Sequence, residues 1–252
     1  MLKSYFRDFH KDLVKKSNKT TTKKTAKKVA KKTSKKTAAK TSSKKAEVVS
    51  IDMKKMQERL ANIIPAPLSI DALKPIDLNK YSAEGADFII YKKYCNDIVS
   101  IMNGYIPYEL IFGTFFVVPV LTRESLINLI KRVINVKKLN YYVDPELKED
   151  IVIPSFIMAF NSQLSLKEIK EISLEYYMSN NIDFTFEYDI MSVVELGVIV
   201  KNWREKRSYI ALGTEEDTNF TFFILMTDYL ELNREPLDFR KYIDKEKIYS
   251  EF

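Results

Sequence analysis

Hydrophobic and polar positions divide the chain into an N-terminal part with few apolar residues and a longer part with regular apolar patterns. Apolar residues at helical spacing predict amphipathic helices over 52–64, 122–138 and 165–180, and a buried helix over 218–232. Apolar, β-branched and aromatic runs predict strands over 86–91, 108–120 and 151–160, and a strand or hairpin over 189–203. This order is typical of an α/β domain with a central mixed sheet flanked by helices.

Polar residues mark where three of these helices begin. Asp52 precedes the first helix and Thr122 precedes the second, with Ser125 three residues later. Ser165 and Glu168 form a capping-box pattern at the start of the third. Side-chain oxygens at these positions accept hydrogen bonds from free backbone N–H groups, so we expect the helices to begin there.

The N-terminal part consists of a short leader and a lysine-rich arm. Phe6, Phe9 and Leu13 are spaced like one face of a short helix that docks on the body or on a partner. His10 lies in this leader and receives no catalytic role. The patterns predict four segments: a leader over 1–14, a disordered arm over 15–46, an α/β domain over 47–238 and a charged tail over 239–252.

The arm contains fourteen lysines and no acidic residue between positions 15 and 45. Its core repeats a Lys-Lys pair every four residues and has no aromatic residue. Such a segment buries too little apolar surface to offset its ordering entropy, so we expect it to be disordered when free. The lysines are Lys15, Lys16, Lys19, Lys23, Lys24, Lys27, Lys28, Lys31, Lys32, Lys35, Lys36, Lys40, Lys44 and Lys45.

The arm also decides the sign of the net charge. The chain has 41 Lys and Arg against 34 Asp and Glu, so subtracting the fourteen arm lysines leaves 27 basic and 34 acidic residues, a net charge of −7. A basic arm on an acidic body is suited to a polyanion. We interpret it as a site for nucleic acid, most simply DNA, bound through the phosphates without sequence preference. If half of the lysines contact phosphate, duplex binding should show a log–log salt slope of about −6.

The arm resembles, in composition, the lysine-rich tails of linker histones and of lysine-repeat bacterial nucleoid proteins. Alternative interpretations are a solubilising tail and an attraction to acidic lipid headgroups. A transit peptide fits less well, because such peptides favour Arg on an amphipathic face.

Composition excludes several other classes of site. The chain has five Gly and neither a G-x-G-x-x-G nor a P-loop motif. One cysteine, Cys95, and one histidine, His10, exclude a disulfide framework and a Cys/His zinc site. No signal peptide and no apolar run of membrane-spanning length is present, which predicts a cytoplasmic protein, nucleoid-associated if it is bacterial.

Two stretches of the body carry a resemblance to a known family. They are Gly85-Ala-Asp-Phe-Ile-Ile-Tyr91 and the strand and helix from Pro107 to Leu126, in which Pro107, Glu109, Leu121 and Thr122 match the pattern. Over roughly 52–235 the chain is similar to an uncharacterised bacterial domain family of the restriction-endonuclease-like PD-(D/E)XK superfamily. The resemblance implies a nuclease fold whose strand-opening Asp and E-x-K motif bind a divalent metal and activate water.

The chain departs from this pattern at the metal site. Asp87 is present, but Phe116 stands at the Glu position and Val118 at the Lys position. Neither side chain binds Mg²⁺ or transfers a proton. Glu109 lies seven residues before Phe116, about 23 Å along an extended strand, and Glu146-Leu147-Lys148 spells E-x-K only in a charged loop.

Three functional hypotheses follow. The first is a non-enzymatic nucleic-acid-associated protein, with a degenerate nuclease body for recognition, partner contacts or a homo-oligomer, and no cofactor. The second is an Mg²⁺-dependent nuclease with a relocated site that uses Asp87, Glu109 and Glu146, and the third is a self-associating structural protein. Basic residues that form candidate patches on the body are Lys131, Arg132, Lys137, Lys138, Arg204, Lys206 and Arg207, with Trp203 beside them.

Overall fold

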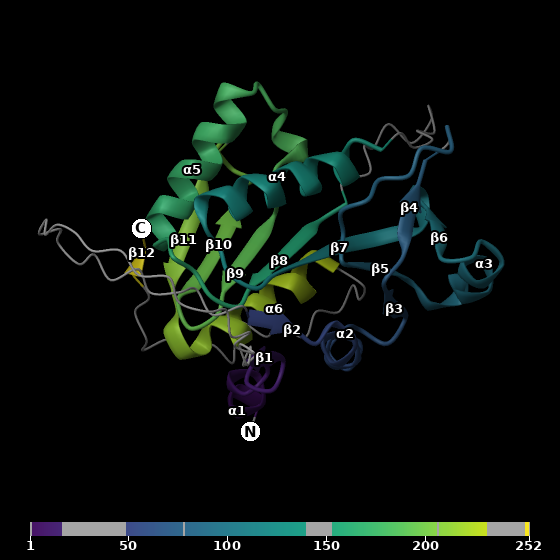
Figure 1. Cartoon of the computed structure of the whole chain (residues 1–252), viewed down its shortest axis with the longest axis horizontal. Coiled ribbons are helices and arrows are strands. Elements are labelled where there is room, and N and C mark those ends of the chain that lie inside the picture. Colours follow the sequence, from purple (N-terminus) through teal and green to yellow (C-terminus); the bar gives the residue numbers. More distant parts are fainter. Residues whose placement is uncertain are drawn as a thin grey trace, which may run out of the picture.

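A single mixed sheet of eight strands forms the centre of the molecule (Figure 1). The computed structural model describes residues 2–16, 49–77, 79–139, 153–205, 207–230 and 250–251. Most of the predicted arm and tail lies outside these ranges. In spatial order the strands are β12 (Ser250–Glu251), β11 (Tyr209–Gly213), β10 (Gly197–Lys201), β9 (Ile190–Val193), β8 (Ser155–Ala159), β7 (Ile111–Val118), β5 (Phe88–Lys92) and β3 (Leu68–Asp71).

The middle of the sheet is parallel and its two sides are antiparallel. β7 pairs with β8 and β8 with β9 in parallel, with Thr114 opposite Ser155 and Phe156 opposite Ile190. Helix α4 (Arg123–Lys137) connects the first pair and helix α5 (Leu166–Ser179) follows β8, as parallel connections require. The mixed sheet flanked by helices confirms the predicted fold class.

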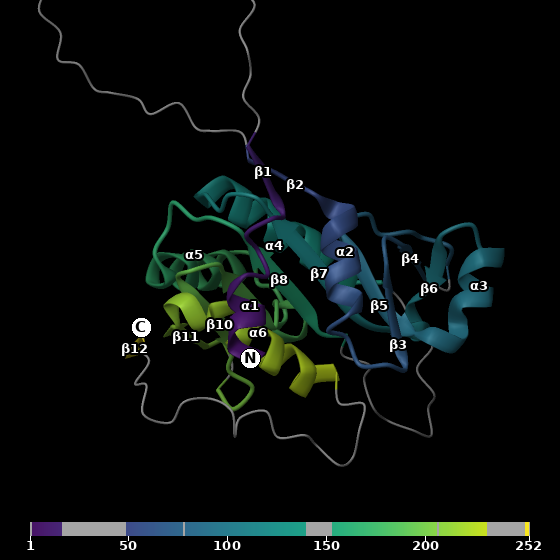
Figure 2. The same cartoon turned by 90° about the horizontal axis from the view of Figure 1, so that it is seen from below.

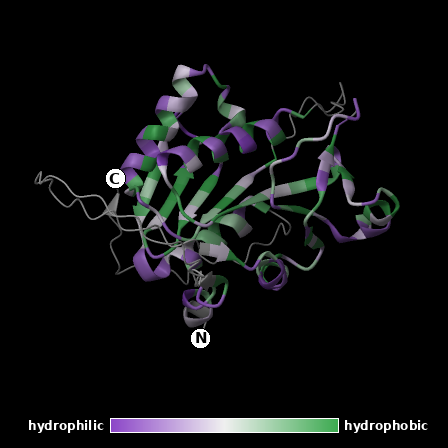
Figure 3. Cartoon of the chain, viewed as in Figure 1, coloured by the Kyte–Doolittle hydropathy of each residue, from purple (hydrophilic) through white to green (hydrophobic). Residues whose placement is uncertain are grey.

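Helices cover both faces of this sheet. One core contains side chains of α4 and α5 packed on the upper face in Figure 1. The other contains side chains of α1 (Leu2–Arg7), α2 (Met53–Ala61) and α6 (Thr218–Leu230) on the lower face. The central strands are mostly hydrophobic, and α4 and α5 contain both hydrophobic and hydrophilic residues (Figure 3). Burial on both faces explains why the central strands read as continuous apolar runs.

The predicted helix starts are confirmed. The Asp52 carboxylate accepts a hydrogen bond from the Lys55 backbone N–H at 3.2 Å. Thr122 and Ser125 cap α4 reciprocally, and Ser165 and Glu168 do the same for α5. Each cap satisfies backbone donors that the first helical turn leaves free.

Several short elements were not predicted. They include strands β3 and β11 at the sheet margins and a lobe in which β4 (Lys74–Ile76) pairs in parallel with β6 (Tyr105–Pro107) beside α3 (Asn96–Ile101). They are too short for their period to show. The remaining short helices are η1 (Lys93–Cys95), η2 (Tyr108–Leu110), η3 (Phe184–Phe186) and η4 (Glu215–Asp217).

The leader packs on the body. Phe6, Phe9 and Leu13 are buried, and the Phe9 ring lies 4.9 Å from that of Phe223 on α6. The Asn219 side-chain amide donates to the Phe6 carbonyl at 3.1 Å. Helix α1 therefore lies against α6, as Figure 2 shows.

The leader also reaches the strand that follows the lysine-rich segment. Strand β1 (Val14–Lys16) pairs antiparallel with β2 (Val49–Ile51), and Lys16 is opposite Val49 (Figure 2). Residues 16 and 49, on either side of the lysine-rich sequence, are therefore neighbours in the same ladder. The lysine-rich sequence is inserted between two docked strands.

Candidate functional site

Asp87 lies directly before β5, at the position that the nuclease pattern predicts. Its backbone N–H donates to the Phe115 carbonyl of β7 at 2.9 Å. Its carboxylate oxygen Oδ2 accepts from the Val117 backbone N–H at 2.7 Å. Asp87 therefore ties the start of β5 to the middle of β7.

Arg132 of α4 supplies the positive charge at this carboxylate. Its Nη2 donates to Asp87 Oδ2 at 2.9 Å and its Nε donates to the Gly85 carbonyl at 2.8 Å. The guanidinium carbon lies 5.5 Å from the centre of the Phe116 ring, close enough for a cation–π contact. Asp87 and Arg132 are partly exposed, at 24% and 35% of their side-chain area, whereas Phe116 is fully buried.

Gly85 permits this arrangement. A Cβ atom at position 85 would lie 3.1 Å from the Arg132 carbonyl oxygen. The glycine thus allows α4 to approach the loop before β5, which brings Arg132 to Asp87.

The residues at this position do not fit the Mg²⁺ ion that the nuclease resemblance implies. The Asp87 oxygen Oδ2 already accepts from a backbone N–H and a guanidinium. Phe116 and Val118, both buried, offer no oxygen or nitrogen. The guanidinium provides the cationic partner of Asp87, and the Phe116 ring lies beneath it.

The other predicted carboxylates are not brought to Asp87 by any described contact. Glu109 lies in η2, before β7 begins. Glu146 and Lys148 fall outside the described residues. Across the described part of the chain, no group of three or more His, Cys, Asp or Glu side chains is placed to hold a metal ion.

The predicted lysine site falls almost entirely outside the described residues. Lys15 and Lys16 lie in β1. The other twelve lie between residues 17 and 48. Their assignment to nucleic acid stays a prediction.

The predicted basic patches separate into different roles. Lys131, Lys138, Arg204 and Arg207 are exposed, and Trp203 is about half exposed. Lys206 falls outside the described residues, and Arg132 is paired with Asp87. The expectation of an exposed patch was wrong for Lys137, because its aliphatic stem packs in the core and its ammonium group enters a buried network.

That network holds the end of α4 to the sheet. Lys137 Nζ donates to Asp189 Oδ2 at 2.6 Å and to the Glu187 carbonyl at 2.7 Å. The same Asp189 oxygen accepts from the Ser155 backbone N–H at 2.8 Å and hydroxyl at 3.0 Å. Through Oδ2, Asp189 ties the end of α4 to the start of β8, whereas its buried Oδ1 has no hydrogen-bond partner among the described residues.

Lys201 forms the outer part of the network. Its ammonium donates to the Phe184 carbonyl at 2.5 Å and lies 3.9 Å and 4.1 Å from the ring centres of Phe184 and Trp203. Burial lowers the pKa of Lys201 to about 8, although the nearby Asp189 carboxylate acts in the opposite direction. Burial also raises the pKa of Glu187. Sequence spacing gave no signal for this cluster, because its members come from separate elements.

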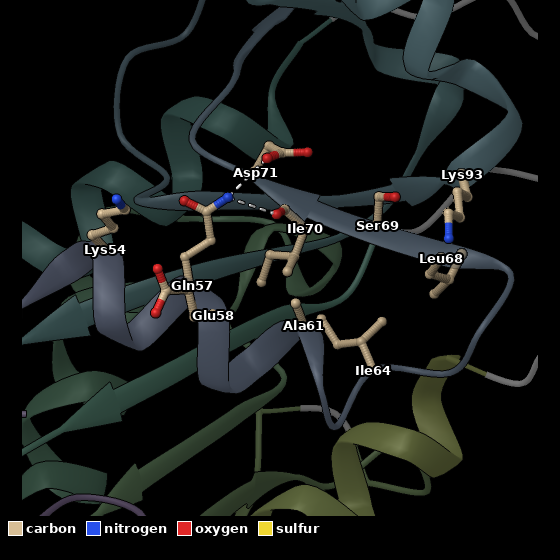
Figure 4. Close-up of a pocket in the computed structure, with 10 residues that line it drawn as sticks. All are labelled: Lys54, Gln57, Glu58, Ala61, Ile64, Leu68, Ser69, Ile70, Asp71 and Lys93. Carbon is tan, nitrogen blue, oxygen red and sulfur yellow. Dashed lines mark hydrogen bonds between the residues drawn. The ribbon is translucent and has the colours of Figure 1, made fainter.

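A groove of about 460 Å³ lies between α2 and the edge strand β3 (Figure 4). Gln57 on α2 donates its side-chain amide to the Ile70 carbonyl at 3.1 Å and to Asp71 Oδ1 at 2.8 Å. The second Asp71 oxygen accepts from the Tyr91 hydroxyl at 2.6 Å. Lys54 and Lys93 lie at opposite ends of the groove in Figure 4.

Comparison with known proteins shows a shared fold. The sequence matches no protein-family profile and none of the curated proteins. The apo form of NucC from E. coli MS115-1 superposes with a TM-score of 0.57 at 13% identity, over 76% of this chain and 90% of NucC. The cAAA-bound forms of NucC from P. aeruginosa ATCC27853 and from E. coli MS115-1 give TM-scores of 0.55 and 0.56 at 12% and 13% identity, each over 71% of this chain and 76% of NucC.

The chain has a restriction-endonuclease-like fold. The expectation drawn from Asp87, Pro107 and Thr122 is thereby confirmed at the level of the fold. Within the described ranges, no helix is long and apolar enough to cross a membrane.

Proposed function

We propose that this protein binds nucleic acid without cutting it, with the lysine-rich segment as its main contact to phosphate and the nuclease-like body as a platform. The observation that carries the proposal is the pairing of Asp87 with Arg132 above the Phe116 ring. The chain shares its fold with NucC. The pairing supports a site in which the Arg132 guanidinium takes the place of a metal ion at Asp87.

The position of the lysine-rich segment supports the second half of the proposal. The segment starts and ends at the β1–β2 ladder, which the docked leader holds on the body. Phosphate bound by the lysines would therefore be tethered to the body through both ends of the segment. The affinity should depend steeply on salt, because each neutralised phosphate releases counterions.

The test compares the full chain with a variant in which residues 17–48 are replaced by a Gly/Ser linker of equal length. This replacement retains both strands of the ladder. Fluorescence anisotropy over a salt series with Mg²⁺ present should show tight binding by the full chain, intact DNA and at least a tenfold loss in the variant, since lysine contacts supply the non-specific affinity. Equal binding by the variant would refute the assignment of the lysines.

The alternative is an Mg²⁺-dependent nuclease with a relocated site at Asp87, Glu109 and Glu146. The same assay decides between the two, because cleavage abolished by Asp87→Ala and by EDTA would establish the nuclease. RNA and duplex DNA probes measured in parallel identify the preferred polyanion.

The body also offers a surface for a protein partner or a second copy. Ile98 and Ile101, three residues apart on α3, are 41% and 80% exposed. Two exposed apolar side chains on one short helix provide a candidate contact surface. Light scattering of the full chain and of an Ile98→Ser, Ile101→Ser variant tests self-association, and a monomer at all concentrations would leave the surface to a different protein.

A further inference from the structure

The groove between α2 and β3 lies beside the point where the lysine-rich segment rejoins the body. β2 ends at Ile51 and α2 begins at Met53, so Lys54 stands three residues after the ladder. Figure 2 shows β1, β2 and α2 next to one another on the same side of the molecule. The lysine-rich segment is therefore joined to the body beside this groove.

The ends of the groove carry positive charge. Lys54 and Lys93 both line it, and neither forms an ion pair with any residue that the structure describes. By contrast, the neighbouring Lys55 points to Asp12, with 3.7 Å between Nζ and Oδ2. Two unpaired ammonium groups are available for successive phosphates.

Two carboxylates also line the groove, and they differ in their surroundings. Asp71 is already bonded to Gln57 and to the Tyr91 hydroxyl, so it forms part of the wall. Glu58 projects from α2 beside the groove (Figure 4). Its negative charge repels a bound anion, so neutralising Glu58 should strengthen binding if the groove holds phosphate.

An aromatic ring follows the second lysine. Tyr94 follows Lys93 in the sequence and lies outside the set of residues that line the groove; it is 72% exposed, and the Lys92 ammonium lies 5.5 Å from its ring centre. An exposed ring flanked by cations is suited to stacking an unpaired base. The groove volume falls in the range of pockets that bind small ligands, so it can admit a nucleotide unit of a single strand, whereas a duplex can only lie across its rim.

We propose that the α2–β3 groove binds an unpaired segment of nucleic acid, with phosphates on Lys54 and Lys93 and a base on Tyr94. This inference rests on the proposed function and extends it. The lysine-rich segment provides affinity for any polyanion, and the groove provides a preference for single strands.

The experiment measures binding of the full chain to a labelled 20-nucleotide oligo-dT and to a labelled 20-base-pair duplex over a salt series. Lys54→Gln with Lys93→Gln should weaken oligo-dT binding about tenfold at low salt and reduce the log–log slope by about 1.4, as expected for two lost phosphate contacts on a single strand. Tyr94→Ala should weaken oligo-dT binding about tenfold through lost stacking. Glu58→Gln should tighten it about twofold, the effect of one exposed charge.

Two control variants match these changes away from the groove. Lys167→Gln with Lys170→Gln removes the same charge from α5, and Tyr5→Ala removes an exposed ring from α1. Both controls should bind oligo-dT as the wild type does, and duplex affinity should change less than twofold in the groove variants. The groove assignment would be overturned by equal losses of affinity in the control and groove variants, or by equal losses for the two probes. Weaker binding of oligo-dT by Glu58→Gln would also overturn it. If the wild type binds neither probe, the proposed function itself fails.

Discussion

Replacing Arg132 by Met tests whether the guanidinium is the fixed cation of Asp87. Methionine keeps the aliphatic stem over Phe116 but removes the hydrogen bonds to Asp87 Oδ2 and to the Gly85 carbonyl. Hydrogen bonds to charged groups contribute about 1.5–3 kcal/mol, and stranding a fully buried charge costs about 3–5 kcal/mol. Because the two side chains are 24% and 35% exposed, solvent screening reduces the expected loss to about 2 kcal/mol.

The assay is urea unfolding of the full chain, supported by thermal melts. A loss of about 2 kcal/mol corresponds to a fall in Tm of roughly 4–8 °C for a domain of this size. The double variant Arg132→Met, Asp87→Asn should lose about 1 kcal/mol less stability than the sum of the two single variants, because each substitution removes the same ion pair.

Arg123→Met is the matched control on the same helix. Arg123 pairs with Glu175 at 2.9 Å, but both side chains are about 60% exposed, so the variant should stay within about 0.5 kcal/mol of the wild type. Equal effects of the two arginine substitutions would refute the reasoning. A rise in Tm on adding Mg²⁺ but not Na⁺, seen in the wild type and absent in Asp87→Asn, would show that a metal binds where we place the guanidinium.

Three further predictions concern the network, the leader and a helix cap. The pKa of Lys201 is lowered to about 8, below its value of about 10.4 in an unfolded chain, so the unfolded state holds more protons between these two values. The free energy of unfolding should therefore rise from pH 8 to pH 9.5. Lys201→Met should remove this rise in urea titrations, and an unchanged pH profile in the variant would contradict the assignment. Phe9→Ala should lower the free energy of unfolding by about 3 kcal/mol in the same assay, because the ring is buried against α6. Tyr5 is exposed, so Tyr5→Ala should have little effect. Equal losses of stability in the two variants would mean that the leader is not docked. Thr122→Ala should cost about 1 kcal/mol by removing the reciprocal cap of α4, and Thr122→Ser should recover most of it in thermal melts.

The sequence pattern predicted the larger elements because each carries a local signal. The helices start at Asp52, Thr122 and Ser165, where the caps are observed. The apolar run that became β7 was read correctly because a strand buried on both faces needs hydrophobic residues at every position. By contrast, β3 and β11 contain four and five residues, too few to show a period.

The candidate site was predicted only in part. Asp87, Phe116 and Val118 follow from the motif, because their positions are fixed within two neighbouring strands. The partner of Asp87 is forty-five residues away on α4, where Arg132 looks like one of several helix-surface cations. Only the packing of α4 against the loop at Gly85 brings the two together.

The docking of the leader on the body also depends on long-range packing, so the sequence alone did not predict where it docks. The spacing of Phe6, Phe9 and Leu13 indicates an apolar face but does not identify the surface that covers it. The pairing of β1 with β2 spans the whole lysine-rich sequence, and such a long-range contact leaves no local signal.

We propose that the protein holds nucleic acid and leaves it intact. The most direct measurement is the anisotropy of a labelled duplex with the full chain over a salt series in Mg²⁺, followed by analysis of the same DNA on a denaturing gel. We expect a log–log slope of about −6 and full-length DNA at every time point. Cleavage that depends on Mg²⁺ and disappears in Asp87→Ala would contradict it.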